Sequence, residues 1–247
     1  MGTLAFVQAR MGSTRLPGKA LAPLAGRPSL LRILDRLSRV AALDGVAVLT
    51  SLASSDDDIA ALCASEDVTC VRGDEHDVLA RFQLASRQLR PERVVRVTAD
   101  CPLVDPEVVG DLLALHSSRP ALAYASVATG ALAAESGLRR FPDGLDAEVF
   151  GADVLERASR EASDPYEREH VTPYVWRQPE IFLAAVLECE SDLGDERWTV
   201  DHPADLELVG AVYERLCEPF GWREVLALLE RDPALRDLNA MYRAQPG

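Results

Sequence analysis

Three cations and several small residues gather in one short stretch near the N-terminus. The segment FVQARMGSTRLPGKAL covers residues 6–21 and holds Arg10, Gly12, Ser13, Arg15, Gly18 and Lys19. Small residues let a backbone approach a ligand closely, while arginine and lysine neutralise phosphate charge. These residue types at this spacing predict a phosphate-binding loop. A solvated basic turn with ordinary Gly and Pro residues is the alternative.

The spacing distinguishes this loop from the Walker A motif, G-x-x-x-x-G-K-[ST]. Five residues stand between Gly12 and Gly18, and Ala20 follows Lys19 where the motif has a metal-binding hydroxyl. A P-loop NTPase is therefore not favoured. Three cations instead suit a nucleotidyl transferase, which must stabilise negative charge on the α-phosphate and on the departing pyrophosphate.

Metal ligands must then come from other parts of the chain. The stretch VTADCPLVDP places Asp100 at the end of an expected strand, and RWTVDHPADLELV places Asp201 after a short expected strand. Carboxylates there can hold Mg²⁺ against phosphates. The alternatives are a turn or N-cap role for Asp100 and an N-cap role for Asp201 ahead of helix 203–217.

The order of elements brings these residues to one edge of a sheet. Strands are expected at 3–9, 45–51, 68–73 and 93–100, and helices at 28–43, 55–66, 76–89 and 106–118. Ser55 and Asp56 open the second helix, as N-cap residues do. Four strand-then-helix units with short joints predict a mostly parallel sheet covered on both faces, with ligands at the carboxyl ends of its strands.

The second half of the chain is less regular. Strands are expected at 145–150 and 181–189, helices at 151–162, 203–217 and 222–232, and helices or turns over 165–177. The segment 125–145 shows no clear pattern. Such a segment is typical of a flap or a subunit contact over a site.

Composition limits the class of protein. The chain has 247 residues, a length that fits one large α/β domain or two small ones. Its formal charge is −14. A sequence pI near 4.7 argues against nucleic acid as the main partner. We see no signal peptide and no apolar run near the ~18 residues of a membrane span. The five cysteines form no C-x-x-C pair, so we expect reduced thiols in a cytoplasmic protein.

Six ordered segments resemble the SpsF-type cytidylyltransferases, a family named from spore-coat polysaccharide synthesis. They are QARMGSTRLPGKAL (8–21), RGDEHDVLARF (72–82), VRVTADCPLVDP (95–106), FPDGLDAEVF (141–150), EREHVTPYVW (167–176) and WTVDHPADLELV (198–209). The family is related to the 3-deoxy-manno-octulosonate and acylneuraminate cytidylyltransferases. The resemblance implies an α/β three-layer sandwich with a nucleotide-diphospho-sugar transferase fold. It also implies transfer of CMP from CTP to a sugar with release of pyrophosphate.

The resemblance further implies one nucleotidyltransferase domain over residues 1–247. Residues 1–120 would bind the nucleotide, and residues 121–247 would bind the acceptor and form a possible dimer contact. The expected catalytic residues are Arg10, Arg15, Lys19 and Asp100, with Mg²⁺ held by Asp100 and Asp201. The expected nucleotide-binding residues are Ala9, Gly12, Ser13, Thr50, Ser51, Arg72, Gly73, Asp77 and Arg81. The expected acceptor-binding residues are Asp143, Asp146, Glu148, Glu167 and His170.

Several alternatives stay open at this stage. Asp143 and Gly144 form a common turn pair, and His170 could be a structural histidine. His202 either supports Asp201 or lies in solvent, and Cys101 is expected to pack rather than to act as a nucleophile. No ulosonate-binding pattern is present, so the acceptor is not defined beyond a sugar acid, sugar phosphate or phosphonate.

Three functions therefore compete. The first is in-line attack on CTP by a small acceptor, in a protein expected to be a homodimer without nucleic acid or membrane as a partner. The second is a glycosyltransferase that uses a sugar nucleotide, although no D-x-D motif stands near residue 100. The third is a non-catalytic nucleotide-binding protein, which the presence of Arg10, Lys19, Asp100 and Asp201 argues against.

Overall fold

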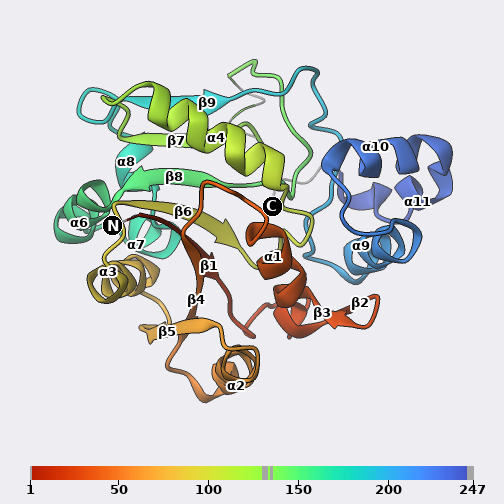
Figure 1. Cartoon of the computed structure of the whole chain (residues 1–247), viewed down its shortest axis with the longest axis horizontal. Coiled ribbons are helices and arrows are strands. Elements are labelled where there is room, and N and C mark those ends of the chain that lie inside the picture. The colour runs from red at the N-terminus through yellow and green to blue at the C-terminus, as the bar shows by residue number, and fades with distance from the viewer. Residues whose placement is uncertain (1, 130–132, 134–135, 244–247) are drawn as a thin grey trace.

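A seven-stranded sheet forms the centre of the molecule (Figure 1). The computed structural model describes residues 2–129, 133 and 136–243. The strands are β1 (Thr3–Gln8), β4 (Gly45–Ser51), β5 (Thr69–Gly73), β6 (Arg93–Thr98), β7 (Tyr124–Val127), β8 (Glu148–Gly151) and β9 (Ala184–Leu187), in the order β5-β4-β1-β6-β8-β7-β9. All neighbouring pairs are parallel except those that β8 makes with β6 and β7. The predicted mostly parallel sheet is therefore confirmed.

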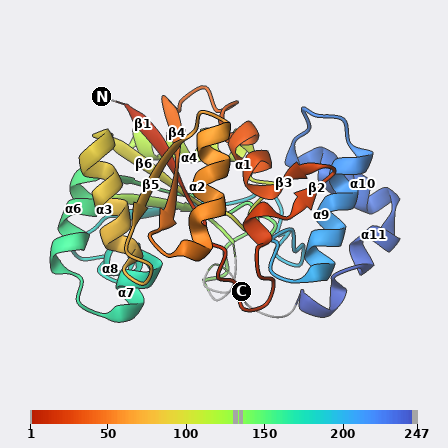
Figure 2. The same ribbon diagram turned by 90° about the horizontal axis from the view of Figure 1, so that it is seen from below.

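Helices cover both faces of this sheet. They are α1 (Ser29–Leu37), α2 (Asp57–Ser65), α3 (Val78–Leu89), α4 (Pro106–Ser118), α6 (Ala152–Glu161), α7 (Pro165–His170), α8 (Pro173–Trp176), α9 (Pro203–Arg215), α10 (Trp222–Arg231) and α11 (Pro233–Asp237). Along β1, Ala5 and Val7 pack into one buried cluster with α1, α2 and α4, while Phe6 packs into another with α3 and α6. This alternation follows from the two-residue period of a strand. Figure 2 shows α9, α10 and α11 gathered at one end of the molecule, away from α3 and α6.

The chain between β1 and α1 differs from the expected strand, loop and helix. The loop leads into a single 3-10 turn, Lys19–Leu21, and then into a hairpin of β2 (Pro23–Leu24) and β3 (Arg27–Pro28). Proline cannot continue a helix, so Pro23 ends the turn and α1 begins only at Ser29. The predicted helix 28–43 is confirmed at its start, but α1 ends at Leu37 rather than at residue 43. The short turn leaves the side chain of Lys19 directed toward the sheet edge.

Two further expectations about local structure are wrong. The start of segment 125–145 is not patternless, because β7 occupies Tyr124–Val127; residues 130–132 and 134–135 of that segment lie outside the described residues. Three of the four β7 residues are buried, so the strand shows no alternation of apolar and polar residues. The expected strand before Asp201 is also absent, and Arg197 forms only an isolated bridge with Asp143.

Backbone hydrogen bonds still bring the segment before Asp201 to the sheet edge. The N–H of Val200 donates to the Asp100 carbonyl at 2.7 Å, and the N–H of Trp198 donates to the Asp143 carbonyl at 2.6 Å. The second half of the chain is thereby fastened beside the end of β6. Within the described residues, no helix is both long enough and apolar enough to cross a membrane.

Candidate active site

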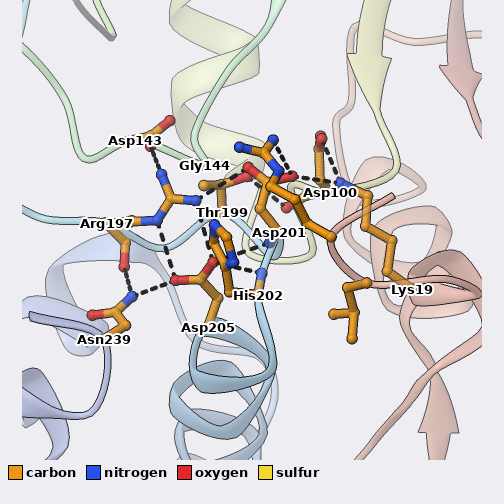
Figure 3. A network of polar contacts seen from close by, with 12 residues as sticks. Lys19, Asp100, Asp143, Gly144, Arg197, Thr199, Asp201, His202, Asp205 and Asn239 are labelled. Carbon is orange, nitrogen blue, oxygen red and sulfur yellow. Dashed lines mark hydrogen bonds and ion pairs between the residues drawn. The ribbon is translucent and has the colours of Figure 1, made fainter. Parts of the chain in front are cut away.

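Lys19 stands at the centre of a group of charged side chains at the carboxyl edge of the sheet (Figure 3). Its Nζ donates to Asp100 Oδ2 at 2.9 Å and to Asp201 Oδ1 at 2.8 Å. Lys19 follows β1, Asp100 follows β6 and Asp201 precedes α9, so three distant segments meet at one point. The structure thus brings together the loop lysine and the two carboxylates that the sequence singled out.

Arg197 holds Asp201 from another side. Its guanidinium lies 3.1 Å from Asp201 Oδ2, 3.0 Å from Asp143 Oδ2 and 3.2 Å from each oxygen of Asp205. Asn239 in turn donates to Asp205 at 2.8 Å. Arg197 is not among the residues predicted from the sequence, where its one signal is its place directly before the WTVDHP segment.

Neither predicted metal ligand caps a helix. The N-cap of α9 is His202, and Asp205 Oδ2 accepts from the backbone N–H groups of Asp201 at 3.1 Å and of His202 at 2.9 Å. The helix after Asp100 is capped by Asp105. The N-cap alternative is therefore wrong for both residues, and their carboxylates remain directed at Lys19.

The loop presents its other predicted residues around the same point. Arg15 Nη2 lies 3.2 Å from Asp201 Oδ1, and Arg10 is exposed just after β1. Ser13 Oγ accepts a hydrogen bond from a loop N–H at 3.3 Å, so it shapes the loop. A Cβ on Gly12 would meet nothing within 4 Å, so this glycine leaves open space next to the cations.

Asp56 fastens the loop to the end of β4. Its Oδ1 accepts from Met11 N at 2.8 Å, and its Oδ2 accepts from Ser51 N at 3.1 Å and Ser51 Oγ at 2.5 Å. Burial would raise the pKa of Asp56, but these hydrogen bonds together lower it. Asp56 occupies the N-cap position of α2, as expected, but its side chain makes no capping hydrogen bond there. Its anchoring role was not predicted, and its place in the loop between β4 and α2 was the one signal for it.

Five of the predicted nucleotide-binding residues lie at or just after the carboxyl ends of β1, β4 and β5, namely Ala9, Thr50, Ser51, Arg72 and Gly73. Ala9, Thr50 and Ser51 are buried there. Arg72 donates to the Ser51 carbonyl at 2.8 Å and pairs with Asp57 at 2.8 Å. These residues border the loop, and their contact with a nucleotide stays a prediction.

Two members of the same set have structural partners. Asp77 caps α3, and its carboxylate lies 2.6 Å from Arg168 of α7. Arg81 is buried and donates to two carbonyls of the turn after β5 at 3.1 Å. A Cβ on Gly73 would lie 2.9 Å from Arg81 Cγ, so the two residues are in direct contact. Both charged residues brace this edge of the sheet.

A cavity of about 880 Å³ opens beside the charged group, between it and β7–β9. This volume lies within the usual range for small-molecule sites. Its lining contains Asp100, Asp201 and Arg15 together with the acceptor-side candidates Asp143, Asp146, Glu148 and His170. Among the described residues, Glu167 of α7 is not part of the lining. The structure therefore gathers four of the five acceptor candidates.

The carboxylates of the cavity have altered proton affinities. Burial, reinforced by Asp146 and opposed by Arg197, raises the pKa of Asp143 to about 7. Burial also raises the pKa of Asp146. The ring of His170 lies 4.3 Å from that of Tyr166, and burial lowers its pKa, so it is mainly neutral near pH 7.

Glu148 is held by three partners in the cavity wall. It forms an ion pair with Arg96 and accepts from the hydroxyls of Tyr124 at 2.5 Å and Thr172 at 2.7 Å. Arg96 also donates to Gln8 at 3.2 Å. These bonds join β1, β6, β7 and β8 beneath the cavity and fix the direction of the carboxylate.

Asp100 and Asp201 fit a magnesium ion that is shared with phosphates. Mg²⁺ usually takes one or two protein carboxylates and completes its shell with phosphate oxygens and water. Within the described residues, no group of three or more His, Cys, Asp or Glu side chains forms a complete metal site. The two carboxylates nevertheless converge on one point. The donor set thus suits an ion that arrives with a nucleotide.

Cys101 and His202 have structural contacts. Cys101 is buried, and its Sγ lies 3.6 Å from Asp100 Oδ1 and 3.9 Å from Asp146 Oδ2. Burial and these carboxylates raise the pKa of the thiol well above its usual value, which makes it a poor nucleophile. The ring of His202 stacks on Tyr242 with centroids 3.8 Å apart, so it is not simply solvated.

The sequence profile of the cytidylyltransferase family matches residues 4–210. The chain belongs to the cytidylyltransferase family. It is therefore a CTP-dependent nucleotidyltransferase, as the resemblance implied, and this activity prevails over the glycosyltransferase and non-catalytic alternatives.

Individual relatives agree with this assignment. The spore coat polysaccharide biosynthesis protein SpsF of Bacillus subtilis is 34% identical over 240 residues, which cover 93% of this chain and 95% of that protein. The 3-deoxy-manno-octulosonate cytidylyltransferase of Anaeromyxobacter dehalogenans strain 2CP-C is 30% identical over 220 residues, or 84% and 88% of the two chains.

Solved structures share the fold. A cytidylyltransferase from Leptospira borgpetersenii superposes with a TM-score of 0.86 at 29% identity, over 95% of this chain and 96% of that one. CMP:2-keto-3-deoxy-manno-octonic acid synthetase, solved in complex with CTP, superposes with a TM-score of 0.62 at 20% identity, over 87% and 99% of the two chains. The predicted three-layer nucleotidyltransferase fold is thus confirmed.

Proposed function

We propose that this cytidylyltransferase moves CMP from CTP to a sugar-type acceptor in a Mg²⁺-dependent reaction that releases pyrophosphate. Sugar acids and sugar phosphates are the first acceptor classes to consider. The observation that carries the proposal is the meeting of Lys19, Asp100 and Asp201 beside a cavity of about 880 Å³. Cations from the loop, carboxylates from the sheet edge and room for a second substrate occur at one place.

Residues 1–120 form the nucleotide-binding half in this proposal. The support is the position of the loop, which lies beside the buried ends of β1, β4 and β5 and is anchored by Asp56. Residues 121–247 form the acceptor half, because β7, β8, β9 and α7 supply much of the cavity lining. Asp201 belongs to the second half but reaches back to Lys19, so the two substrates would meet between these residues.

The reaction is an in-line displacement at the α-phosphorus of CTP. A bond forms between an acceptor oxygen and this phosphorus, and the bond to the oxygen that bridges to the β-phosphate breaks. Pyrophosphate departs with that electron pair. Arg10, Arg15 and Lys19 neutralise its charge, and the loop holds the triphosphate in line with the acceptor.

Asp100 and Asp201 would hold the Mg²⁺ ion, which supplies charge neutralisation between the phosphates when it is bound. In the structure Lys19 lies between these carboxylates and keeps them in place. Arg197 keeps Asp201 directed at the same point. The chain's own residues thus prepare the site before a nucleotide enters.

We further propose a homodimer in the cytoplasm, with its contact in the acceptor half. Ile181, Leu183 and Val186 are exposed apolar residues at or next to the edge strand β9, which supports this position. Reduced thiols support the compartment, since all five cysteines are unpaired. Light scattering of the purified protein would test the dimer.

A thermal shift with CTP, UTP, GTP and ATP, each with and without Mg²⁺, tests the nucleotide half of the proposal. A ligand at 100 times its Kd adds about 2.7 kcal/mol, which corresponds to roughly 5–10 °C for a chain of this size. We expect such a shift for CTP, enlarged by Mg²⁺. Pyrophosphate release is then screened with sugar acids, sugar phosphates and phosphonates.

Two results would contradict the proposal. One is the absence of a shift with every triphosphate. The other is hydrolysis of a sugar nucleotide without any CTP-dependent pyrophosphate release, which would favour the glycosyltransferase reaction.

A further inference from the structure

The cavity beside the charged group carries more negative than positive side chains. Its described lining includes the five carboxylates Asp100, Asp143, Asp146, Glu148 and Asp201. The arginines of that lining are Arg15 and Arg96. A purely anionic acceptor would therefore find few cations in this lining.

Both arginines already have carboxylate partners. Arg15 Nη2 lies 3.2 Å from Asp201 Oδ1, and Arg96 forms its ion pair with Glu148. Arg15 also belongs to the loop that we assign to the triphosphate. Each guanidinium is thus partly neutralised by a carboxylate of the protein before an acceptor enters.

Asp146 differs from the other carboxylates in its partners. Asp143 lies 3.0 Å from Arg197, and Asp100 and Asp201 share Lys19. Asp146 instead accepts from neutral donors, which are the hydroxyl of Thr129, the N–H of Gly144 at 2.8 Å and the thiol of Cys101 at 3.9 Å. Among the described residues no ion pair to Asp146 occurs. An ionised carboxylate so placed would favour a ligand that brings its own positive charge.

Aromatic side chains line the same cavity. Tyr124, Tyr166 and Trp176 belong to its lining. Two of these rings already hold a cation of the protein, because Arg177 lies 4.7 Å from the ring centroid of Tyr166 and 5.2 Å from that of Trp176. The aromatic residues therefore form walls of the cavity, and a charged partner for a cationic ligand must come from the carboxylates.

A second metal ion explains Asp146 less well than an ammonium group. A divalent ion away from the phosphates would need several protein oxygens. The part of the chain that the structure describes contains no group of three or more His, Cys, Asp or Glu side chains that could hold one. A single carboxylate suits a protonated amine better, because one charge-assisted hydrogen bond is enough to hold it.

We propose that the acceptor is an amino sugar whose protonated amine pairs with Asp146. This inference rests on the proposed function, because it names the substrate class of the same site. The attacking oxygen lies at the Asp100 and Asp201 end of the cavity, and any anionic group of the acceptor lies there too, next to Arg15 and Lys19. The amine keeps its proton throughout; the bonds that form and break are those at the α-phosphorus.

Matched acceptors test this assignment. Glucosamine, galactosamine and mannosamine 1-phosphates are each compared with their N-acetylated counterparts, which keep the sugar and the phosphate but lose the positive charge. Equilibrium binding to the full-length enzyme in the presence of Mg²⁺ is measured for each pair. A charged hydrogen bond predicts an affinity about 10- to 100-fold higher for the amine in at least one pair.

Asp146→Asn should remove this preference. The amide oxygen can still accept from Gly144 N–H, and the amide nitrogen can donate to the Thr129 hydroxyl, so the shape of the site is kept. Asp58→Asn is the matched control, because Asp58 is exposed on α2 and is not part of the described cavity lining, so this variant should keep the preference. If one variant does not fold, the comparison of amino sugars with N-acetylated sugars on the wild-type enzyme still tests the proposal.

The outcomes separate this inference from the proposed function. Equal or tighter binding of the N-acetylated sugars, binding of none of the amines, or a preference that survives in Asp146→Asn would each overturn the amino-sugar assignment. A thermal shift with CTP and Mg²⁺ in the same preparation reports the proposed function independently. A CTP shift without amine preference overturns only the acceptor class, whereas the absence of a CTP shift overturns both.

Discussion

Lys19 Nζ lies 2.9 Å from Asp100 Oδ2 and 2.8 Å from Asp201 Oδ1, so one ammonium group joins the two candidate metal ligands. Burial would lower the pKa of Lys19, but the two carboxylates outweigh it and raise that pKa. Burial would likewise raise the pKa of Asp100, but Lys19 and the Thr98 hydroxyl lower it. Lys19 and Asp100 are therefore both kept charged, and the lysine holds the two carboxylates together before a ligand arrives.

The first prediction concerns the loss of this ammonium group. In Lys19→Met the two carboxylates would face each other without a cation, so Mg²⁺ should raise the melting temperature of the variant more than that of the wild type. Turnover should fall by about 10²- to 10³-fold, because a charge that stabilises the leaving pyrophosphate is lost. Thermal melts with and without Mg²⁺ and a pyrophosphate-release assay measure the two effects.

Arg139→Met, in an exposed pair with Glu188, is the control for Lys19→Met. Normal pyrophosphate release by Lys19→Met would show that this loop does not bind the triphosphate.

Asp56 should control the affinity for CTP without touching the ligand. Asp56→Ala leaves the backbone N–H groups of Met11 and Ser51 without their acceptor, which costs about 1–3 kcal/mol for each buried group left unpaired. The loop would lose its anchor to β4, and we expect the KM for CTP to rise about tenfold or more. Steady-state kinetics check this. Asp58→Asn, an exposed neighbour on α2, should behave as wild type, and an equal rise in KM in both variants would disprove the anchoring role.

Gly144 and Gly12 should respond to alanine in opposite ways. A Cβ on Gly144 would lie 2.4 Å from Thr199 N, and its φ of +105° is unfavourable for other residues, so Gly144→Ala should be strongly destabilised or unfolded.

A Cβ on Gly12 would meet nothing within 4 Å, so Gly12→Ala should keep its melting temperature. The same variant should lose CTP affinity if the triphosphate fills that space. Unchanged CTP binding in a folded Gly12→Ala would place the phosphates elsewhere.

Arg197 should matter for stability far more than an exposed arginine. Its side chain is 4% exposed and faces Asp143, Asp201 and Asp205. Arg197→Met leaves Asp143 and Asp205 without this cation, whereas Asp201 keeps Lys19 and Arg15. Breaking a buried ion pair from one side typically costs about 3–5 kcal/mol. The Arg139→Met control should change stability by less than about 1 kcal/mol. Urea unfolding compares the two, and equal midpoints would refute the structural role of Arg197.

Asp143 gives the stability of the protein a specific pH dependence. In the unfolded chain an aspartate ionises near pH ~3.9, whereas burial raises the pKa of Asp143 to about 7 in the folded chain. Between these values the folded state binds the extra proton, so the stability from this group is complete below about pH 4 and is lost as the pH rises through about 7. In Asp143→Asn this loss is absent. Urea unfolding at several pH values from 5 to 8 should show a shallower decline for the variant than for the wild type, and parallel curves would contradict the assignment.

The order of strands and helices in the first half was readable from local patterns. The strand 45–51 and the helix 106–118 have the same bounds in the structure, because their hydrophobic runs and their flanking Gly, Asp and Pro residues are local signals. The prediction of a strand before Asp201 is wrong for the opposite reason. Segment 197–200 is held by backbone bonds to Asp100 and Asp143, which are far away in the chain and leave no local pattern.

The sequence by itself determined the family and the mostly parallel sheet, and it singled out Arg15, Lys19, Asp100 and Asp201 as candidates, since residue type and order in a motif are local information. Only the tertiary structure decided which groups pair. The ammonium group of Lys19 lies between two carboxylates, and the Asp56 carboxylate binds the loop backbone at Met11. Arg197 donates to Asp201, and Asp146 has no cation among its described partners. Pairing depends on distance in space, and segments far apart in the chain come together only when the core is packed.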